Sequence, residues 1–508
     1  MADLSSGLAG GTAARRVTFL AIVALLLPLS AFSLAGSPAA ASPARTETMV
    51  LAAERQPKVH RPTLERLKRD ADRKGISLEQ AVDAYIAEKA KTDPAATANW
   101  PDGPVDIPDV AIDDLSAAHI EVLKGMAQAQ GVSFSESIER HGSWPAAKQK
   151  LVQLQQAFKG EFAGGERAAD GSHVWLGFKG DIPAPAIEAA KTLPLRVELQ
   201  GRLGYTEAEL NDTKKRVHHA LRDDPRFSDV ASYYDARTGT VHSLVVPVPA
   251  AKASVQGDAV DSAVSSLVTN PSITVDVTVT DRPVASTFSF TATSASVSTS
   301  AVDPYIRGGG NLGDCTSNFN VVATWDYETR RHATAGHCAN GASTRRYCNY
   351  SIDGGNCTTI SLTNSCWLGC AYGDAALYTR GDLTLTRTFY WSSNQKAYVD
   401  AEDPVQWVGD DVCKWGTATG TTCGTVQRTN WSNDNSDNLF VTDQPAGTGC
   451  DHGDSGGPVF TGGPSAGFTA YGIVVGQGAL VGRAGLYCAY SHVTVYRDAF
   501  GYRIWNRE

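Results

Sequence analysis

The placement of cysteine divides this chain into two unlike parts. All ten cysteines lie between Cys315 and Cys488, and none precedes that segment. An even number of cysteines confined to one segment is typical of a disulfide framework made in an oxidising compartment. The other common use of cysteine is a zinc site, but the paired Cys-x-x-Cys knuckles of such sites are missing. We therefore expect a cysteine-free front part, a disulfide-stapled back part and no metal.

The N-terminal residues predict export. The pair Arg15-Arg16 precedes an apolar run, Val17 to Leu29, and small residues follow up to Ala41. This order is typical of a secretory signal peptide, which we place at residues 1–41. The run is short for a bilayer span, so a membrane anchor is the weaker alternative. The paired arginines suit the twin-arginine route, whereas disulfides that form after export favour the general secretory route. We expect a secreted, extracellular protein without membrane contact after signal removal.

Residues 42–281 mix helical and β patterns, which predicts an α+β region. Two capping boxes, Ser77–Gln80 and Thr206–Glu209, each predict the start of a helix. A turn at 235–239 separates two strand-like runs, and a third run alternates apolar and polar residues. The expected strands are 229–234, 240–248 and 272–280. A stretch rich in Pro and Asp, 95–110, is interpreted as an internal linker between two subdomains.

The composition changes twice beyond this region. Residues 282–304 are mostly Ser, Thr and Ala, and such a stretch buries little surface and stays exposed. Exposed segments of small residues are preferred sites of proteolysis, so we expect processing here. In residues 305–508, short β-branched runs alternate with turns, which predicts an all-β barrel or sandwich. The clearest expected strands are 319–324, 423–427 and 471–475, and a short closing helix with a tail is expected at 496–502.

The overall charge gives no sign of a nucleic-acid partner. The chain has a net charge of −9, with 42% hydrophobic and 19% charged residues, which is ordinary for a globular protein. No basic patch stands out along the sequence. We expect protein or peptide partners and a monomer.

Two short strings hold the residues of nucleophilic catalysis. The first is Thr-Ala-Gly-His337-Cys, and the second is Gly453-Asp-Ser455-Gly-Gly-Pro. A serine hydroxyl becomes a nucleophile only when an adjacent imidazole removes its proton. It also needs backbone N–H groups aimed at the oxyanion that forms on attack. The glycines around Ser455 permit a tight turn, so the N–H groups of Gly453 and Ser455 can point into one small space.

These strings resemble those of the chymotrypsin-like serine peptidases, and more closely the secreted bacterial streptogrisin and alpha-lytic group. The resemblance covers about the last 200 residues, from Ile306 onward. It implies a mature domain of two six-stranded antiparallel β-barrels with the active site between them, and no cofactor. Ser455 would then be the nucleophile, and His337 would be the general base and later the acid for the leaving amine.

The third member of the triad has two candidates. In the family an aspartate between the other two residues heads a short apolar stretch, and it holds the imidazole in one tautomer. Asp374, in Gly-Asp374-Ala-Ala-Leu, fits this position and is favoured. Asp382, in Gly-Asp382-Leu-Thr-Leu, is the rival. For either residue the structural alternative is an aspartate that caps a turn.

The resemblance also assigns a structural role to Asp454, which would pair with a cation and shape the oxyanion loop. That cation could be a new N-terminus, because Ile306-Arg-Gly-Gly resembles the family's mature start. Bacterial members with large prosequences generally use an internal arginine instead. The residues alone leave both alternatives open.

The disulfide pairing follows the family in part. The resemblance implies the pairs Cys315–Cys338, beside the histidine, and Cys450–Cys488, beside the specificity pocket. It also implies that Cys413–Cys423 closes a hairpin. The other four cysteines allow three connectivities, and the local pairs Cys348–Cys357 and Cys366–Cys370 are our choice among them.

The pocket that selects the substrate residue before the cut (P1) can be partly assigned from the resemblance. No aspartate stands where trypsin-like members carry one, and Val474 stands where glutamate-specific relatives carry a histidine. A neutral or apolar P1 residue is therefore expected. The implied substrate-binding residues are Thr448, Gly449, Val475, Gly476 and Gln477.

Three classes of function compete for this chain. The leading hypothesis is a secreted serine endopeptidase, made as a preproenzyme whose residues 42–281 assist folding and inhibit until they are removed. A non-catalytic binding protein on the same fold would have lost a triad member, and none is lost. An esterase of the α/β-hydrolase type would carry Gly-x-Ser-x-Gly in a nucleophile elbow, which differs from the motif order found here.

Overall fold

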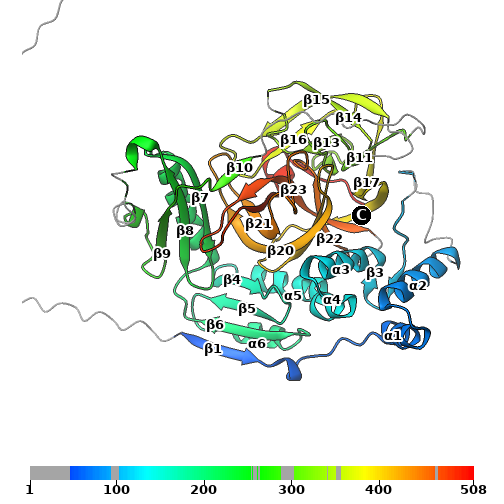
Figure 1. Ribbon diagram of the computed structural model, residues 1–508. Coiled ribbons are helices and arrows are strands. Elements are labelled where there is room, and N and C mark those ends of the chain that lie inside the picture. Colours follow the sequence, from blue (N-terminus) through cyan, green and yellow to red (C-terminus); the bar gives the residue numbers. More distant parts are fainter. Residues whose placement is uncertain are drawn as a thin grey trace, which may run out of the picture. The chain divides into compact units, whose positions relative to one another are not determined.

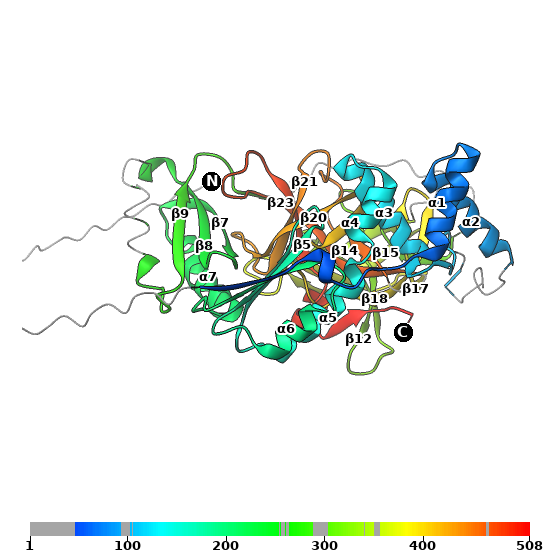
Figure 2. The ribbon, with the colours of Figure 1, turned by 90° about the horizontal axis from the view of Figure 1, so that it is seen from below.

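The structure is a computed structural model (Figures 1 and 2). It describes residues 46–92, 102–103, 105–252, 255, 260, 264–287, 303–339, 341–349, 356–463 and 467–507. The expected signal peptide, 1–41, and residues 288–302 of the expected processing segment lie outside these ranges. Within the described ranges, no helix is both long and apolar enough to cross a bilayer.

The front part contains both helices and strands. Its helices are α1 Pro62–Lys74, α2 Leu78–Thr92, α3 Ala117–Gln130, α4 Phe134–His141, α5 Trp144–Ala157, α6 Ala184–Ala190 and α7 Glu207–Arg222. Its strands are β1 Glu47–Leu51, β2 Ala111–Ile112, β3 Leu115–Ser116, β4 Phe162–Arg167, β5 His173–Phe178, β6 Arg196–Gly201, β7 Phe227–Asp235, β8 Thr240–Pro247, β9 Thr274–Val279 and β10 Ala285–Thr287. Four strands form one sheet in the order β1-β6-β5-β4, and three form another in the order β7-β8-β9.

Both capping boxes are present in this part. The Gln80 N–H donates to Ser77 Oγ over 3.1 Å, and Gln80 Oε1 accepts from the Ser77 N–H over 3.0 Å, just before α2. Thr206 and Glu209 make the same reciprocal pair at the start of α7. Such pairs satisfy N–H groups that a helix start leaves without partners. The predicted strands near 229–234, 240–248 and 272–280 are β7, β8 and β9.

Two stretches expected to be linkers pack against the rest of the protein. Val284 is 1% exposed, and its N–H donates to Asp229 Oδ2, so the expected exposed segment 282–304 is partly buried at its start. In the expected linker 95–110, Ile107 is buried, and Asp102 Oδ2 accepts from Arg387 Nε over 2.7 Å. The composition of these stretches does not predict this packing, because contacts with distant parts of the chain, rather than local apolar runs, hold them in place.

The back part is almost entirely β. Its strands are β11 Tyr305–Gly308, β12 Asn320–Ala323, β13 Arg330–Thr334, β14 Thr344–Cys348, β15 Cys357–Cys366, β16 Ala375–Tyr378, β17 Thr384–Ser392, β18 Gln395–Glu402, β19 Asp411–Gly416, β20 Gly420–Trp431, β21 Leu439–Pro445, β22 Pro458–Gly462, β23 Phe468–Gly478, β24 Tyr487–His492 and β25 Tyr502–Ile504. One helix, α9 Val495–Phe500, lies at the expected closing position, and the tail after it is β25.

Six of these strands close into a barrel. Strands β22, β19, β20, β21 and β24 pair in that order, and β23 pairs with both β22 and β24. The other six-stranded sheet runs from β14 through β15, β16, β13 and β12 to β25. One closed barrel is therefore present, whereas the hydrogen-bonded path of the second sheet is open between its end strands in the part that the structure describes.

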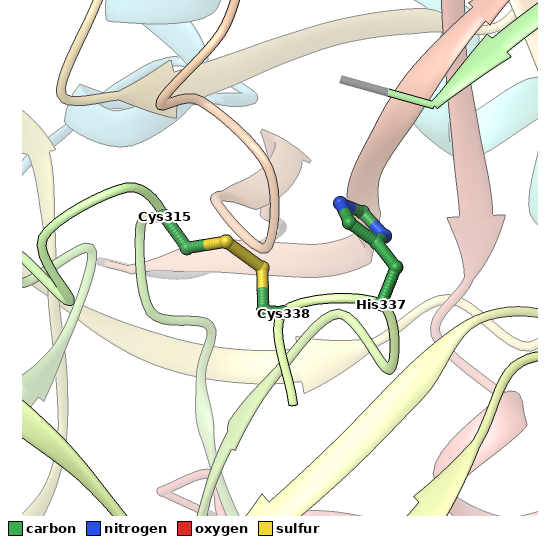
Figure 3. Close-up of side chains that lie close together, drawn as sticks. All are labelled: Cys315, His337 and Cys338. Atoms are coloured by element: carbon green, nitrogen blue, oxygen red, sulfur yellow. A yellow bond between two sulfur atoms is a disulfide. The ribbon is translucent and has the colours of Figure 1, made fainter. Parts of the chain in front are cut away.

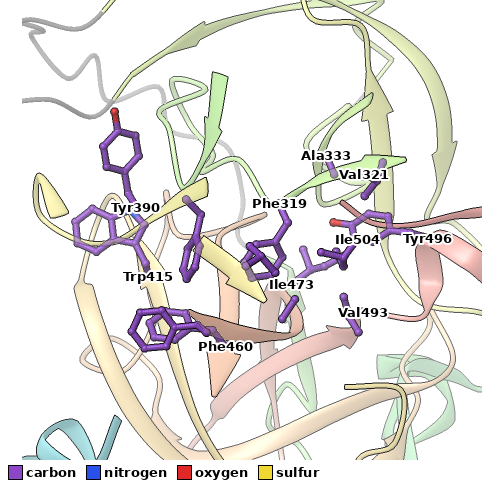
Figure 4. Close-up of a cluster of buried hydrophobic side chains, with 14 of the residues drawn as sticks. Phe319, Val321, Ala333, Tyr390, Trp415, Phe460, Ile473, Val493, Tyr496 and Ile504 are labelled. Atoms are coloured by element: carbon purple, nitrogen blue, oxygen red, sulfur yellow. The ribbon is translucent and has the colours of Figure 1, made fainter. Parts of the chain in front are cut away.

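The two sheets share a buried core (Figure 4). Val321 and Ala333 from the open sheet and Phe460 and Ile473 from the barrel belong to one cluster of buried side chains. Burial of apolar side chains stabilises the contact by roughly 25 cal/mol for each Å² removed from water. This core fixes the relation between the two sheets, and the residues of the candidate site lie on loops from both of them.

Helix α3 of the front part packs on the barrel, against β19, β20 and β22. Gly125 faces the Cys413–Cys423 disulfide, and a Cβ added there would lie 2.3 Å from Cys423 Sγ. Only glycine leaves room for such a close approach of helix and disulfide. Helix α3 of the front part is thus in direct van der Waals contact with the disulfide of the back part.

Candidate active site

A chain of three hydrogen-bonded side chains lies between the two sheets. His337 Nε2 is 2.8 Å from Ser455 Oγ, and His337 Nδ1 is 2.6 Å from Asp374 Oδ2. All three residues are 1% exposed or less. The distances suit an imidazole that takes a proton from the serine while the carboxylate holds its other nitrogen.

Strand pairing brings the histidine and the aspartate together. His337 follows the end of β13, Asp374 immediately precedes β16, and Thr334 pairs with Ala376 in these antiparallel strands. Two further bonds fix the carboxylate and its backbone: the His337 N–H donates to Asp374 Oδ1 over 3.0 Å, and Ser491 Oγ accepts from the Asp374 N–H. The imidazole orientation is therefore set before any substrate arrives.

The rival aspartate lies elsewhere. Asp382 is exposed in the turn before β17, and its backbone N–H donates to Thr358 Oγ1 over 3.0 Å. The structure therefore brings Asp374, and not Asp382, to His337.

The two expected oxyanion donors are the N–H groups of Ser455 and of Gly453, two residues before it. Gly453 adopts a φ of +100°, a conformation open to glycine, and its carbonyl accepts from Thr316 Oγ1 and Thr417 Oγ1. The Thr316 N–H donates to the Ser455 carbonyl over 2.7 Å. These bonds fix both carbonyl groups. Among the described residues, no backbone carbonyl accepts from the N–H groups of Gly453 and Ser455.

The cation paired with Asp454 is Lys414, a residue that sequence analysis did not single out. Lys414 Nζ is 2.9 Å from Asp454 Oδ2, and neither side chain is exposed. Asp454 Oδ1 also accepts from the N–H groups of Ala418 and Thr419. Ile306, the candidate for a new N-terminus, lies instead in β11, paired with Leu385 of β17. An internal lysine therefore occupies the place where the resemblance implied an arginine or an N-terminal amine.

This pair predicts a difference between lysine and arginine at position 414. Burial lowers the pKa of the Lys414 ammonium, although the charge of Asp454 opposes this effect. Once pH rises above that pKa, the lysine is neutral and Asp454 loses its partner, whereas arginine stays charged. We expect Lys414→Arg to keep activity at alkaline pH where the wild type has lost it, measured as kcat/KM from pH 7 to 11.

A second variant tests whether the charge itself is needed. Lys414→Met leaves a buried carboxylate without a cation, a change that costs about 3–5 kcal/mol. We expect this variant to be at least a hundredfold less active than Lys414→Arg. Equal activity of the arginine and methionine variants would contradict a role for the pair. So would an identical decline of kcat/KM at alkaline pH in wild type and Lys414→Arg.

All ten cysteines are paired. The pairs are Cys315–Cys338, Cys348–Cys357, Cys366–Cys370, Cys413–Cys423 and Cys450–Cys488. These are the three pairs that the resemblance implied and the two that we chose. The first of them lies beside the imidazole of His337 (Figure 3). Since Cys315 and Cys338 are joined, neither sulfur is a thiolate that could bind a metal together with His337.

The expected substrate-binding residues fall into two groups. Val475 and Gly476 are buried in β23, next to the loop that carries Ser455, since the Gly456 N–H donates to the Val474 carbonyl over 2.7 Å. Thr448 and Gly449 line a different space, a cavity of about 1030 Å³ bounded by α3 and the Cys413–Cys423 hairpin. Neither Ser455 nor Val475 lines it in the described part of the chain. The two groups are nevertheless neighbours, since Cys450, which follows Gly449, has its Sγ 3.8 Å from the Gly476 carbonyl oxygen and is joined to Cys488, the partner of Gln477 in the sheet.

Part of the front region occupies the edge of β23. Strand β10 pairs antiparallel with it, with Ala285 opposite Gly478, Ser286 opposite Gln477 and Thr287 opposite Gly476 (Figure 1). Sequence analysis missed this strand, because its Ser- and Thr-rich composition predicts exposure.

Comparisons with known proteins give low similarity. No model of a protein family and no curated protein matches the chain. Over 39% of its length the chain is similar to a Nocardiopsis protease, with 24% identity, 98% of that protein covered and a TM-score of 0.30. Thermobifida fusca Protease A shows 24% identity over 40% of this chain and 99% of its own, with a TM-score of 0.31. A glutamic acid specific serine protease shows 23% identity over 39% of this chain and 100% of its own, also with a TM-score of 0.31. The interpretation of the site therefore rests on its own geometry.

Proposed function

We propose that this chain is a secreted serine endopeptidase, made as a preproenzyme and activated by removal of its front part. The observation that carries the proposal is the continuous chain Asp374–His337–Ser455, with hydrogen bonds of 2.6 and 2.8 Å. The direct test is hydrolysis of casein and of a peptide p-nitroanilide by the secreted full chain after processing. Activity that a serine-directed phosphonate abolishes supports the proposal, and a well-folded, inert protein contradicts it.

The geometry supports a two-stage reaction. Ser455 Oγ attacks the scissile carbonyl carbon while its proton moves to His337 Nε2. The carbonyl oxygen becomes an oxyanion, which the N–H groups of Gly453 and Ser455 stabilise. The tetrahedral species collapses, the C–N bond breaks, and His337 gives its proton to the leaving amine. Water then attacks the acyl-enzyme by the same route and releases the acid and free Ser455. Asp374 holds the imidazole and stabilises its cation throughout.

A binding protein without activity is the competing class. Such a protein needs no pre-formed hydrogen bond between the serine and the histidine, and no buried ion pair to brace the loop that carries the serine. Both features are present, with Lys414 and Asp454 fully buried. They favour an enzyme, because a catalytic site needs its reacting groups held in a fixed geometry before substrate binds. The first feature aligns Ser455 with His337, and the second holds the loop of Ser455 in place.

The P1 preference in this proposal is for a neutral or apolar residue. The wall Val475–Gln477 carries no charged side chain, and Val475 and Gly476 are buried. An apolar P1 side chain would gain free energy by leaving water there, whereas a charged one would lose its hydration without a partner.

The front part is proposed to inhibit the enzyme until it is removed. Strand β10 lies along β23, with Ala285 opposite Gly478 and Thr287 opposite Gly476. Its chain therefore runs toward the end of β23 that lies next to the loop of Ser455. An extended substrate would bind by adding a strand to the same edge, so β10 and a substrate compete for one set of backbone hydrogen bonds.

The front part is also proposed to assist folding, through polar contacts with the barrel. Lys148 Nζ lies 2.6 Å from both Asp403 Oδ2 and Asp410 Oδ2, and Arg167 Nη1 lies 2.8 Å from Asp411 Oδ2. These carboxylates come from the segment between β18 and β19 and from β19 itself. Bonds of this kind would hold strands of the barrel in place before their distant partners arrive.

We expect the back part to refold poorly alone and better with the front part added. A barrel depends on non-local strand pairing, and the entropy of loop closure opposes it before the contacts form. The measurement is recovery of peptidase activity after denaturation of the processed enzyme with its disulfides intact, with and without residues 42–300 in trans. Equal recovery would leave the front part as an inhibitor or targeting module only. The same fragment should inhibit native enzyme.

A further inference from the structure

A surface of aromatic and arginine side chains lies at the end of the open sheet that is remote from His337. Strand β13 begins at Arg330 and ends at Thr334, about 13 Å further along, and His337 follows that second end. The turn that leads from β12 into β13 lies near the C-terminal end of the chain (Figure 2). We call this group of residues the arginine–aromatic surface; its members are Trp325, Tyr327, Arg330, Arg503 and Trp505.

The turn holds its two aromatic residues in water. Trp325 is 62% exposed, and Tyr327 is 60% exposed. The carboxylate of Asp326 fixes the turn, since its Oδ1 accepts from the N–H groups of Glu328 and Thr329 over 2.9 Å each. Tyr327 has a φ of +56°, a left-handed conformation that glycine and asparagine adopt far more readily than a bulky residue. A strained aromatic residue kept at an exposed, rigid turn indicates a functional role, because folding alone would favour another residue there.

Two arginines stack on aromatic rings of this surface. The Cζ atom of Arg330 lies 3.9 Å from the centroid of the Trp505 ring. The Cζ atom of Arg503 lies 5.2 Å from the centroid of the Tyr327 ring. Both arginines are cross-strand partners of Val322, so their side chains leave the sheet on the same face. A guanidinium group that stacks on a ring is oriented by it, and its N–H fork can still bind a carboxylate.

The positive charge of this surface has no internal partner. Among the described residues, neither Arg330 nor Arg503 forms an ion pair, and the buried Nε atom of Arg503 has no hydrogen-bond partner. Of the two acids in the turn, Asp326 binds N–H groups of the turn itself, and Glu328 pairs with neither arginine. A chain with a net charge of −9 thus presents unpaired arginines on this face, which favours a partner that carries carboxylates.

Removal of the front part would add a third arginine to the surface. The Cζ atom of Arg387 lies 5.8 Å from the centroid of the Trp505 ring. Its Nη2 atom is 2.6 Å from Oδ2 of Asp102, a residue of the front part. When Asp102 leaves with that part, Arg387 loses its carboxylate partner. The surface is therefore most positive in the processed protein.

We propose that the arginine–aromatic surface is an exosite, a binding surface outside the cleft, for an acidic and apolar segment of a protein substrate. Trp, Tyr and Arg are the residues that contribute most of the binding free energy in protein–protein interfaces. The guanidinium groups match the geometry of Glu and Asp carboxylates, and the exposed rings match apolar side chains between them. This inference rests on the proposed peptidase function and names its substrate class: polypeptides with such a segment at a distance from the scissile bond.

The test uses the secreted full chain after processing and a set of peptides with one scissile segment. Each peptide continues through a Gly/Ser linker of about 16 residues, with an average span of about 22 Å, into a tail. The tails alternate Phe with Glu, Phe with Lys, or Gly with Ser. We expect the Glu/Phe tail to raise kcat/KM about tenfold over the Gly/Ser tail, mainly through KM, because the tail holds the scissile segment near the cleft. The gain should shrink in about 1 M salt.

Two variants identify the surface as the origin of the gain. Tyr327→Asn removes the ring and keeps a residue that tolerates the left-handed backbone. Arg330→Gln removes one charge. Each should reduce the gain from the Glu/Phe tail to about threefold or less. The gain is a ratio of tailed to untailed substrate, so any effect on the cleft itself cancels. The matched control is Arg346→Gln, since Arg346 is an exposed arginine of β14 in the same sheet; it should keep the full gain.

Three results would overturn the proposal. Equal kcat/KM for all three tails shows that no exosite exists. A gain that both variants retain places the exosite elsewhere. A Lys/Phe tail as good as the Glu/Phe tail shows that carboxylates are not recognised. If polygalacturonate binds the wild type while the Glu/Phe tail gives no gain, the partner is an anionic polysaccharide and the proposal is wrong.

Failure of this proposal and failure of the proposed function are distinguishable. A fluorescent Glu/Phe peptide without a scissile segment reports binding by anisotropy, whether or not the chain hydrolyses anything. Binding that Tyr327→Asn and Arg330→Gln weaken at least threefold supports the surface, and no binding by the wild type overturns it. A protein that cleaves no peptide and does not react with a phosphonate contradicts the peptidase proposal instead.

Discussion

Ser455→Ala is expected to lower kcat on a peptide p-nitroanilide by about a millionfold, the loss typical when a serine nucleophile is removed. Ser455 Oγ is the atom 2.8 Å from His337 Nε2, and without it no acyl-enzyme can form. If maturation is autocatalytic, the variant should also accumulate as an uncut precursor. Rate measurements and the length of the secreted chain on a denaturing gel check both outcomes.

Ser361→Ala is the matched control, because Ser361 is an exposed serine of β15 in the same domain. It should be processed and active. Turnover close to wild type in Ser455→Ala would show that another residue is the nucleophile. An inactive Ser455→Ala protein that is still cut normally would show that a different protease performs the maturation.

Asp374→Asn is expected to lower kcat by about ten-thousandfold with the fold intact. Asp374 Oδ2 lies 2.6 Å from His337 Nδ1, and in the active tautomer the Nδ1–H group donates a hydrogen bond to the carboxylate. An amide NH₂ in that place forces the other tautomer, and Nε2 can then no longer accept the serine proton. The measurement is kcat on the same peptide, with the circular dichroism spectrum as the check of fold.

Asp382→Asn provides the comparison, because Asp382 is exposed and bonds through its backbone to Thr358. This variant should be nearly silent. If the effects of the two substitutions are exchanged, the third triad residue has been assigned to the wrong aspartate.

Features that depend on neighbours in sequence could be predicted, because the physical cause lies within one turn or one strand. The capping boxes at Ser77 and Thr206 are such features: each satisfies the first N–H groups of its own helix. The hairpin of β7 and β8 is another, since its turn residues and alternating strands are adjacent.

Features that depend on distant partners could not be predicted in the same way. Asp374 and Asp382 stand in similar local contexts, so only the family resemblance favoured Asp374, and the pairing of β13 with β16 is what brings it to His337. Lys414 was missed as the partner of Asp454, because a buried lysine and an exposed one look alike in sequence until the fold places a carboxylate beside it.

Strand β10 shows a third kind of limit. Its residues Ala285–Thr287 have none of the apolar alternation that predicts a strand, yet they pair with β23. Backbone N–H and C=O groups along a strand edge bind any extended segment whatever its side chains, so the partner edge and not the composition decides the structure.

The central claim is that His337 and Asp374 activate Ser455, and site-resolved labelling tests it most directly. The processed protein is treated with a fluorophosphonate, digested and mapped by mass spectrometry. The account predicts one adduct, on Ser455, that is absent from the Ser455→Ala variant and at least a thousandfold slower to form in His337→Ala, because the imidazole no longer removes the serine proton. Adduct formation at another serine, or equal labelling rates with and without His337, would contradict it.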